Sequence, residues 1–260
     1  MPAMDYSRVA GLYDAYVTTD LDLDFFLDET MKVGGPVLEL MAGTGRVSIP
    51  LLQAAVDLTC VDNSPAMLDV FRDKLRQQKL SAELIEADVC ELSLDRRFDL
   101  IFIPFHSFAE ITEPGVQRQA LSHIRHHLAD NGRFICTLHN PSVRLQEADG
   151  RRRPLGEFPL PHTGETLALS ITERYDPAAH VVTGTQFFEI RDSQETTVSE
   201  AAIDIRHYVH DREAFEGLLD HADFAISALY GDYERAPFES DTSPFMIWDL
   251  AAKPTDPRSE

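Results

Sequence analysis

The sequence has few cations. Only four of its 260 residues are lysines, and 23 Lys and Arg residues stand against 44 Asp and Glu, which gives a net charge of −21 at pH 7. A surface this negative repels phosphate backbones, and the single basic run, at residues 151–153, is too short to offset it. We therefore expect no nucleic-acid partner.

Cysteines and long apolar runs are also scarce. Cys60, Cys90 and Cys136 are odd in number and form no Cys-x-x-Cys pair, and two of them lie inside apolar runs. This usage predicts buried free thiols in a reducing cytosol, and we expect no metal site. The first ten residues lack a basic region followed by an apolar core, and no apolar run approaches membrane-spanning length. These absences predict a soluble, cytoplasmic protein without a membrane partner.

The chain is long enough to bury a full core as one large α/β domain with an insertion. Its first 35 residues are expected to form two helices, at about 7–16 and 21–31, which end before the Gly34-Gly35-Pro36 stop. Tyr13 falls near two other tyrosines at helical spacing. A stripe of this kind is more typical of a core than of a cofactor site.

From Val37 onward, strand and helix patterns alternate. Strands are predicted by short apolar runs at about 37–41, 58–61, 83–86, 98–104 and 133–138, with a helix at 114–129 before the last of them. Alternation of this kind implies right-handed crossovers and a mostly parallel sheet. Its ligand site is expected at the carboxyl ends of the strands.

The pattern changes after Pro141. Residues 165–175, 181–191 and 197–209 alternate between apolar and polar side chains and are separated by turn signals, which predicts an antiparallel meander. A helix at 212–221 and strands at 225–230 and 245–251 then predict a closing hairpin. The predicted fold class is α/β, with a Rossmann-like sheet that is mostly parallel, an antiparallel last strand and an inserted antiparallel β-meander. We expect a helical cap at 1–35, a cofactor-binding core at 36–141, the acceptor-side insertion at 142–210 and a C-terminal helix and hairpin at 211–253.

The stretch VLELMAGTGR predicts a buried strand that runs into a tight turn and then a helix, a layout that brings backbone close to a nucleotide-like ligand. Met41 occupies the place of the first glycine in the three-glycine dinucleotide fingerprint, which counts against a pyrophosphate ligand. Glu39 lies on the first predicted strand, whereas Asp62 and Asp88 end the second and third, and all three carboxylates are expected on one rim of the sheet. Partly buried carboxylates cost free energy unless a ligand or donor satisfies them. Each aspartate, taken singly, also fits a helix cap or turn.

Together with CVDNSPAML, EADV and FDLIFIPFHSF, this stretch resembles the class I S-adenosylmethionine-dependent methyltransferases over residues 37–138. The resemblance implies S-adenosyl-L-methionine as cofactor. It implies that the glycine turn and Glu39 meet the methionine part, that Asp62 accepts from the ribose hydroxyls, and that Asp88 with Val89 holds the adenine. The full implied cofactor set is Tyr13, Glu39, Ala42, Gly43, Gly45, Asp62, Asn63, Met67, Asp88, Val89 and Pro104.

Methyl transfer from a sulfonium is a direct displacement, for which alignment and a single general base are sufficient. The catalytic candidates at the mouth of the site are His106, His139 and Tyr13, the last of which is expected to cover the cofactor. His106 equally fits a polar loop residue that only shapes the pocket, and His139 begins a turn-like His-Asn-Pro sequence. The inserted meander is expected to cover a small-molecule acceptor.

The arrangement of cap, core and insertion is similar to that of the sugar-amine and glycine N-methyltransferase groups. The resemblance implies methyl transfer to an N or O atom of a small molecule by a monomer or homodimer. One alternative is a Rossmann-type nicotinamide oxidoreductase, against which the missing glycine and the antiparallel last strand count. Another is a non-catalytic S-adenosylmethionine-binding protein, which would keep the cofactor acids but need no base or open acceptor pocket.

Overall fold

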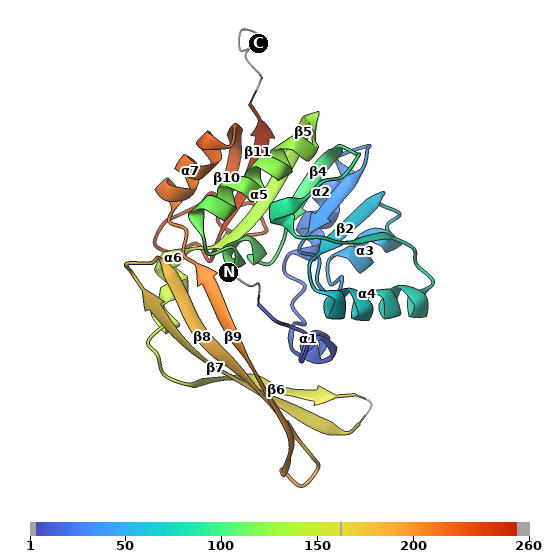
Figure 1. Ribbon diagram of the computed structural model, residues 1–260, viewed down its shortest axis with the longest axis vertical. Helices are drawn as coiled ribbons and strands as arrows, with labels where there is room; N and C mark the ends of the chain where they lie inside the picture. Colours follow the sequence, from blue (N-terminus) through green and yellow to red (C-terminus); the bar gives the residue numbers. More distant parts are fainter. Residues whose placement is uncertain (1–3, 162, 254–260) are drawn as a thin grey trace.

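The computed structural model describes residues 4–161 and 163–253. Within them the chain forms two sheets (Figure 1), and the central sheet has the strand order β10-β11-β5-β4-β1-β2-β3. The strands are β1 (Val37–Leu40), β2 (Leu58–Asp62), β3 (Glu83–Glu86), β4 (Phe98–Ile103), β5 (Leu128–His139), β10 (Phe224–Tyr230) and β11 (Phe245–Ala252). Neighbours among β1 to β5 pair in parallel, whereas β11 pairs antiparallel with both β5 and β10. The predicted fold class is confirmed.

Helices cover both faces of the central sheet. The two core clusters place α2 (Leu23–Met31), α3 (Ser48–Gln53) and α4 (Pro65–Gln78) on one face, and α5 (Pro114–His127) and α7 (Arg212–His221) on the other. Leu38 packs in the α5 and α7 cluster, while Val37 packs in the opposite one, because successive strand residues point to opposite faces. Coverage on both faces explains why the parallel strands read as unbroken apolar runs.

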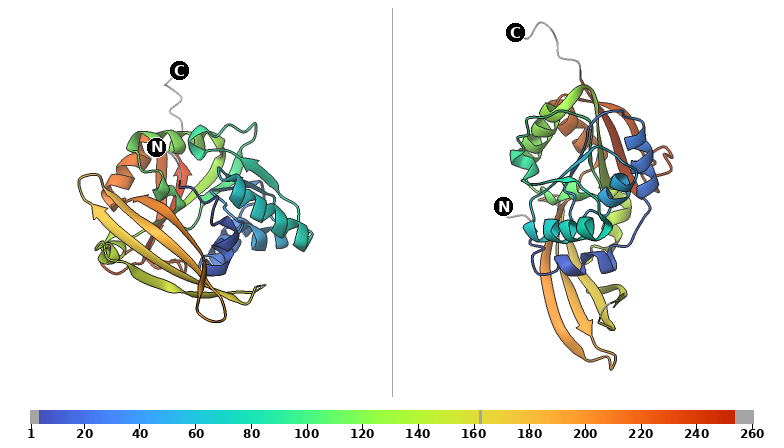
Figure 2. Two further views of the ribbon diagram at one scale, coloured as in Figure 1. Left: turned by 60° about the horizontal axis from the view of Figure 1, so that its bottom comes forward. Right: turned by 90° about the vertical axis from the view of Figure 1, so that its right-hand side faces the viewer.

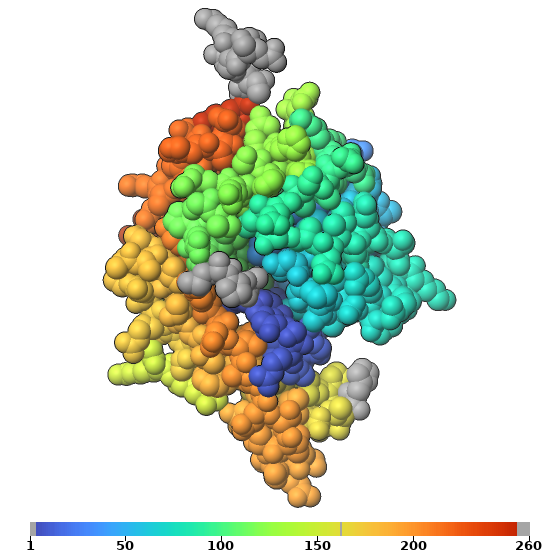
Figure 3. All heavy atoms as spheres, viewed as in Figure 1, coloured from blue at the N-terminus to red at the C-terminus, as the bar shows by residue number. Residues whose placement is uncertain are grey.

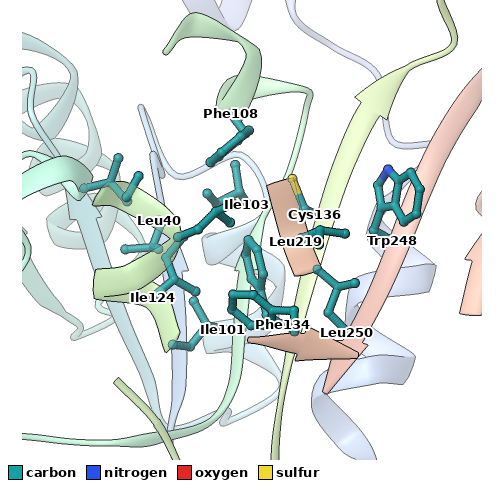
Figure 4. Packing of buried hydrophobic residues seen from close by; sticks show 14 of the residues in the cluster. Leu40, Ile101, Ile103, Phe108, Ile124, Phe134, Cys136, Leu219, Trp248 and Leu250 are labelled. Atoms are coloured by element: carbon teal, nitrogen blue, oxygen red, sulfur yellow. The ribbon is translucent and has the colours of Figure 1, made fainter. Parts of the chain in front are cut away.

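Figure 4 shows the cluster on the α5 and α7 side. Ile103 of β4, Phe134 of β5 and Trp248 of β11 converge there with Leu219 of α7, and all are essentially inaccessible to solvent. Cys136 lies in the same cluster and Cys60 in the opposite one. Both are free and buried, as predicted, and Cys90 is half-buried and also free.

Helix α4 shows how local sequence positions the site. The Ser64 side chain accepts a hydrogen bond from the Met67 backbone N–H at 3.4 Å, and Pro65 occupies the first helical position, where its missing donor costs nothing. Met67, Leu68, Phe71 and Leu75 are buried along one stripe of the helix. This packing holds the start of α4 beside the end of β2.

Two predicted boundaries were wrong in detail. Helix α5 ends at His127 rather than at residue 129, because Leu128 already pairs with Phe98 as the first residue of β5. Asn131 and Gly132, which lie between the predicted helix and the predicted strand, therefore fall inside a longer strand. Gly132 is suited to this place because a Cβ atom there would lie 2.7 Å from the Phe98 carbonyl oxygen.

The second sheet contains β6 (Arg153–Leu160), β7 (Glu165–Asp176), β8 (Val181–Arg191) and β9 (Thr197–Tyr208), each antiparallel to its neighbours. The sequence predicted only the last three. Strand β6 was missed because Pro154, Gly156 and Pro159 are unusual within strands. As an edge strand β6 tolerates proline, and the register of the β6–β7 pair shifts between Pro154 and Gly156.

Helix α1 (Ala10–Tyr16) packs on the apolar face of the second sheet. The Tyr16 ring centroid lies 5.7 Å from that of Phe188 on β8. Figure 2 shows the second sheet extending away from the central sheet, and Figure 3 shows α1 between that sheet and the core. The short helices α6 (Pro141–Arg144), η1 (Val89–Glu91), η2 (Ser107–Glu110) and η3 (Leu145–Glu147) complete the described elements. None of the described helices has the length and apolarity needed to cross a membrane.

Candidate functional site

The turn after β1 depends on left-handed backbone. Met41, Gly43 and Gly45 have φ angles of 58°, 57° and 79°. A Cβ atom at Gly45 would overlap the Phe71 ring of α4, so glycine is required there, whereas a Cβ atom at Gly43 would meet only open space. Met41 adopts a left-handed conformation that glycine enters without strain. The open side of the turn therefore lies at Gly43.

Asp62 closes this turn from the end of β2. Its Oδ2 atom accepts from the Gly43 backbone N–H at 2.7 Å, and its Oδ1 atom accepts from the Ser64 N–H at 2.8 Å. Burial raises the pKa of Asp62, and these two donors act in the opposite direction. Asp62 thus stabilises the turn, as we predicted when this aspartate was considered alone. Each carboxylate oxygen still has acceptor capacity, which suits a diol.

Glu39 and Asp88 occupy very different surroundings. Glu39 is 1% exposed and accepts a hydrogen bond from the Ser48 hydroxyl, and burial raises its pKa to about 8. Asp88 is exposed and caps η1, because its Oδ1 atom accepts from the Cys90 N–H at 2.8 Å. Val89 is buried directly after it. The two acids mark the ends of a rim that runs from β1 to β3.

The other residues of the predicted cofactor set surround this rim. Ala42 is buried and donates its N–H to the Val61 carbonyl at 3.0 Å. Met67 is buried in the first turn of α4, while Asn63 is exposed just before that helix. Pro104 is buried immediately after β4. Ala42, Asn63 and Pro104 follow the carboxyl ends of β1, β2 and β4, and Met67 lies in the helix that follows β2.

An ion pair that the sequence did not predict fastens the N-terminal segment to the turn. Arg46 donates to both carboxylate oxygens of Asp22, at 2.5 and 2.6 Å, and to the Thr19 carbonyl at 2.9 Å. The Thr44 hydroxyl donates to Asp14 of α1 at 2.6 Å. Only tertiary contact reveals these partners, which are 24 and 30 residues apart.

A cavity of about 520 Å³ lies between the core, the N-terminal segment and the second sheet. Its lining includes Tyr13, His106 and His139, so the structure brings the three catalytic candidates to one space. The residues that line it come from α1, from the segment after β4, from the end of β5 and from β6 to β9. Asp62, one of the predicted cofactor residues, lies near this cavity, since it interacts electrostatically with Glu110 in the cavity wall.

Three histidines meet in the wall of the cavity. The rings of His106 and His139 are stacked with centroids 3.6 Å apart, and His207 reaches the same wall from β9. Burial lowers the pKa of His106 well below its ordinary value and lowers that of His207 to about 4. Desolvation in the cavity wall and the nearby Arg144 cation lower the pKa of His139 to about 3. The cluster is therefore uncharged at neutral pH.

Glu110 is a further site residue that the sequence did not predict. It ends η2, and its Oε1 atom accepts a hydrogen bond from the Tyr6 hydroxyl at 3.4 Å. Its surface opens to the cavity, and burial raises its pKa to about 8. No local motif marks Glu110, because its partner stands 104 residues away in the chain.

The residues that carry the glycine turn and its rim match a known protein family. Over residues 37–132 the chain matches a family model described as a methyltransferase domain. The matched residues contain every predicted cofactor residue except Tyr13, and they also contain His106 and Glu110. His139 and the second sheet lie beyond the matched residues.

The similarity of this chain to individual relatives and solved structures extends beyond residues 37–132. The chain is 28% identical over 149 residues to the cypemycin N-terminal methyltransferase of a Streptomyces species, covering 57% of this chain and 58% of that protein. It spans about three fifths of the length of the curated relatives that it matches.

Two solved structures share the fold. An S-adenosylmethionine-dependent methyltransferase from Clostridium acetobutylicum superposes with a TM-score of 0.81 at 20% identity, over 96% of this chain and 99% of that one. A sugar N-methyltransferase of a Streptoalloteichus species has a TM-score of 0.74 at 16% identity, over 98% of this chain and 95% of that one. The similarity of fold therefore includes the second sheet and the N-terminal segment as well as residues 37–132.

Proposed function

We propose that this protein transfers a methyl group from S-adenosyl-L-methionine to an N or O atom of a small molecule. The observation that carries the proposal is the meeting of Gly43 and Asp62 at 2.7 Å, at the ends of neighbouring parallel strands in a methyltransferase domain. The names of the relatives agree with it, since one solved structure of the same fold is an S-adenosylmethionine-dependent methyltransferase. A nicotinamide oxidoreductase is disfavoured because the domain match is to methyltransferases.

The residues present fit the proposed cofactor. Asp62 offers carboxylate oxygens to the ribose hydroxyls, and the open side of Gly43 admits the methionine part close to the backbone. Asp88 is exposed beside buried Val89, which suits an adenine with an exocyclic amino group. When bound, the cofactor supplies an electrophilic sulfonium methyl group. The chain contributes alignment and exclusion of water around it.

The cavity supports catalysis over mere cofactor binding, because a non-catalytic protein would need no second space beside the cofactor rim. Its volume of about 520 Å³ is ample for a small molecule. Strands β6 to β9 contribute to its wall, so we assign the insertion at residues 142–210 to the acceptor side. Within this cavity we assign proton acceptance to His106, whose neutral imidazole is the form that can take a proton.

Calorimetry with S-adenosylhomocysteine tests the cofactor proposal. We expect binding to the unmodified protein, and we expect Asp62→Ala to weaken it by about 1 to 3 kcal/mol, the scale of lost hydrogen bonds to a charged group. Asp69→Ala is the matched control, because Asp69 is exposed on α4 and forms a surface ion pair with Arg72 three residues away. A protein that does not bind S-adenosylhomocysteine at all would refute the cofactor proposal.

The acceptor is best found by transfer of label. The protein is incubated with S-adenosylmethionine labelled in its methyl group and with whole cell extract, and the labelled product is then identified. The Asp62→Ala protein provides the background reaction. Label on nucleic acid or lipid alone would contradict a small-molecule acceptor.

A further inference from the structure

The charges around the cavity are unevenly paired. Three carboxylates line it, on Asp22, Glu110 and Glu173. Asp22 holds both of its oxygens against the guanidinium of Arg46. Glu173 is fully buried and accepts from Arg144 and from Arg153, the latter at 2.7 Å. Two of the three carboxylates are therefore neutralised by cations of the chain itself.

Glu110 is the exception. In the part of the chain that the structure describes, no cation pairs with it, and its hydrogen bond comes from the neutral Tyr6 hydroxyl at 3.4 Å. The nearby Asp62 carboxylate adds repulsion, which together with burial disfavours the charged form of Glu110. Tyr13 of α1 also faces it, and the histidines in the same wall are uncharged. A cation placed in the cavity would relieve this repulsion.

Aromatic faces gather at the same place. The rings of Tyr6 and Tyr13 lie 6.2 Å apart and those of Tyr13 and Tyr16 lie 5.5 Å apart, and all three line the cavity. Aromatic rings attract cations through their π faces, most strongly where water is excluded. An unpaired carboxylate beside three tyrosine rings is an arrangement that favours an ammonium group over a neutral hydroxyl.

We propose that Glu110 and the tyrosine cluster of Tyr6, Tyr13 and Tyr16 bind the methyl acceptor as a protonated basic amine. This inference rests on the proposed function and narrows its acceptor from N or O to an amine nitrogen. The ammonium N–H groups donate to the Glu110 carboxylate, and the tyrosine rings surround the carbon substituents of the amine. One ammonium proton then passes to the neutral His106 imidazole, which frees the nitrogen lone pair for attack on the methyl group. Glu110 is then the specificity-determining residue of the acceptor site.

The test uses two probes of similar shape, cyclohexylammonium and the neutral cyclohexanol, each titrated into the protein saturated with S-adenosylhomocysteine. We expect the ammonium to bind at least tenfold more tightly than the alcohol. Glu110→Gln should abolish this preference, because it keeps the shape and removes the charge. Glu234→Gln, a change at an exposed glutamate, should retain it.

Proton linkage gives a second readout that a purely structural role would not move. Below its pKa of about 8, Glu110 is mostly protonated and uncharged, so ammonium binding should tighten as the pH rises from about 6 to 9, where an alkylammonium stays charged. Glu110→Gln should remove this dependence. Tyr6→Phe removes the donor that stabilises the carboxylate, so it should shift the tightening to higher pH while leaving S-adenosylhomocysteine binding intact.

The outcomes separate the two proposals. Failure of S-adenosylhomocysteine to bind would overturn the proposed function before the probes are added. Normal S-adenosylhomocysteine binding with no preference for the ammonium, or a preference that survives Glu110→Gln, would overturn the amine inference alone.

Discussion

Replacing His106 with glutamine is expected to slow methyl transfer by about 100-fold or more at saturating acceptor, with the affinity for S-adenosylhomocysteine unchanged. Loss of a general base typically costs this much. His106 is held in place by its stack on His139, at 3.6 Å between centroids, and by the Phe245 ring at 5.1 Å. Its backbone N–H donates to the Thr137 hydroxyl at 3.2 Å. The imidazole is thus positioned in the cavity wall and kept neutral.

Turnover of the labelled acceptor, measured against pH, checks this role. Because burial holds the pKa of His106 well below 6.5, its proton-accepting form persists under mildly acidic conditions, and loss of activity from this group should begin only below that value. His126→Gln is the control, since His126 is exposed on α5. If His106→Gln turns over as fast as the unmodified protein, His106 only shapes the pocket.

Arg46→Met is expected to lower the free energy of unfolding by about 3 to 5 kcal/mol, the usual cost of leaving one partner of a buried ion pair unpaired. The Asp22 side chain is 2% exposed and that of Arg46 is 14% exposed, so water cannot replace the lost partner at Asp22. The guanidinium also lies 4.9 Å from the centroid of the Phe105 ring, a contact that the methionine would only partly replace.

Urea denaturation followed by circular dichroism measures the change, and a lower midpoint with an unchanged slope would identify it as a loss of stability. Arg72→Met on α4 is the control, because the ion pair of Arg72 with Asp69 is exposed to solvent. This variant should change the free energy of unfolding by less than about 0.5 kcal/mol. The double variant Asp22→Leu with Arg46→Met should recover much of the loss, since it removes the stranded carboxylate. Equal stability of the Arg46 and Arg72 variants would contradict the buried pair.

Local sequence patterns were enough to predict the central sheet. Strand and helix periodicities are local, and parallel strands must end on one edge, so Glu39, Asp62 and Asp88 could be placed on one rim of the sheet without coordinates. The missing first glycine at Met41 also pointed away from a pyrophosphate ligand. The helix over residues 212–221 and the antiparallel last strand followed from the same local signals. Strand β6 was not predicted from the sequence, because its proline and glycine residues are tolerated only at the edge of a sheet.

The composition of the cavity depends on long-range packing. His106, His139 and His207 come from three separate elements, and Glu110 meets Tyr6 across 104 residues of chain. Such contacts leave no periodicity in the sequence, because they depend on how the N-terminal segment and the second sheet pack against the core. The pairing of Asp22 and Glu173 with arginines, which leaves Glu110 unpaired among the described residues, is a property of that packing. Local sequence patterns thus specify where the carboxylate rim of the central sheet forms, whereas long-range packing specifies which charges in the cavity stay unpaired among the described residues.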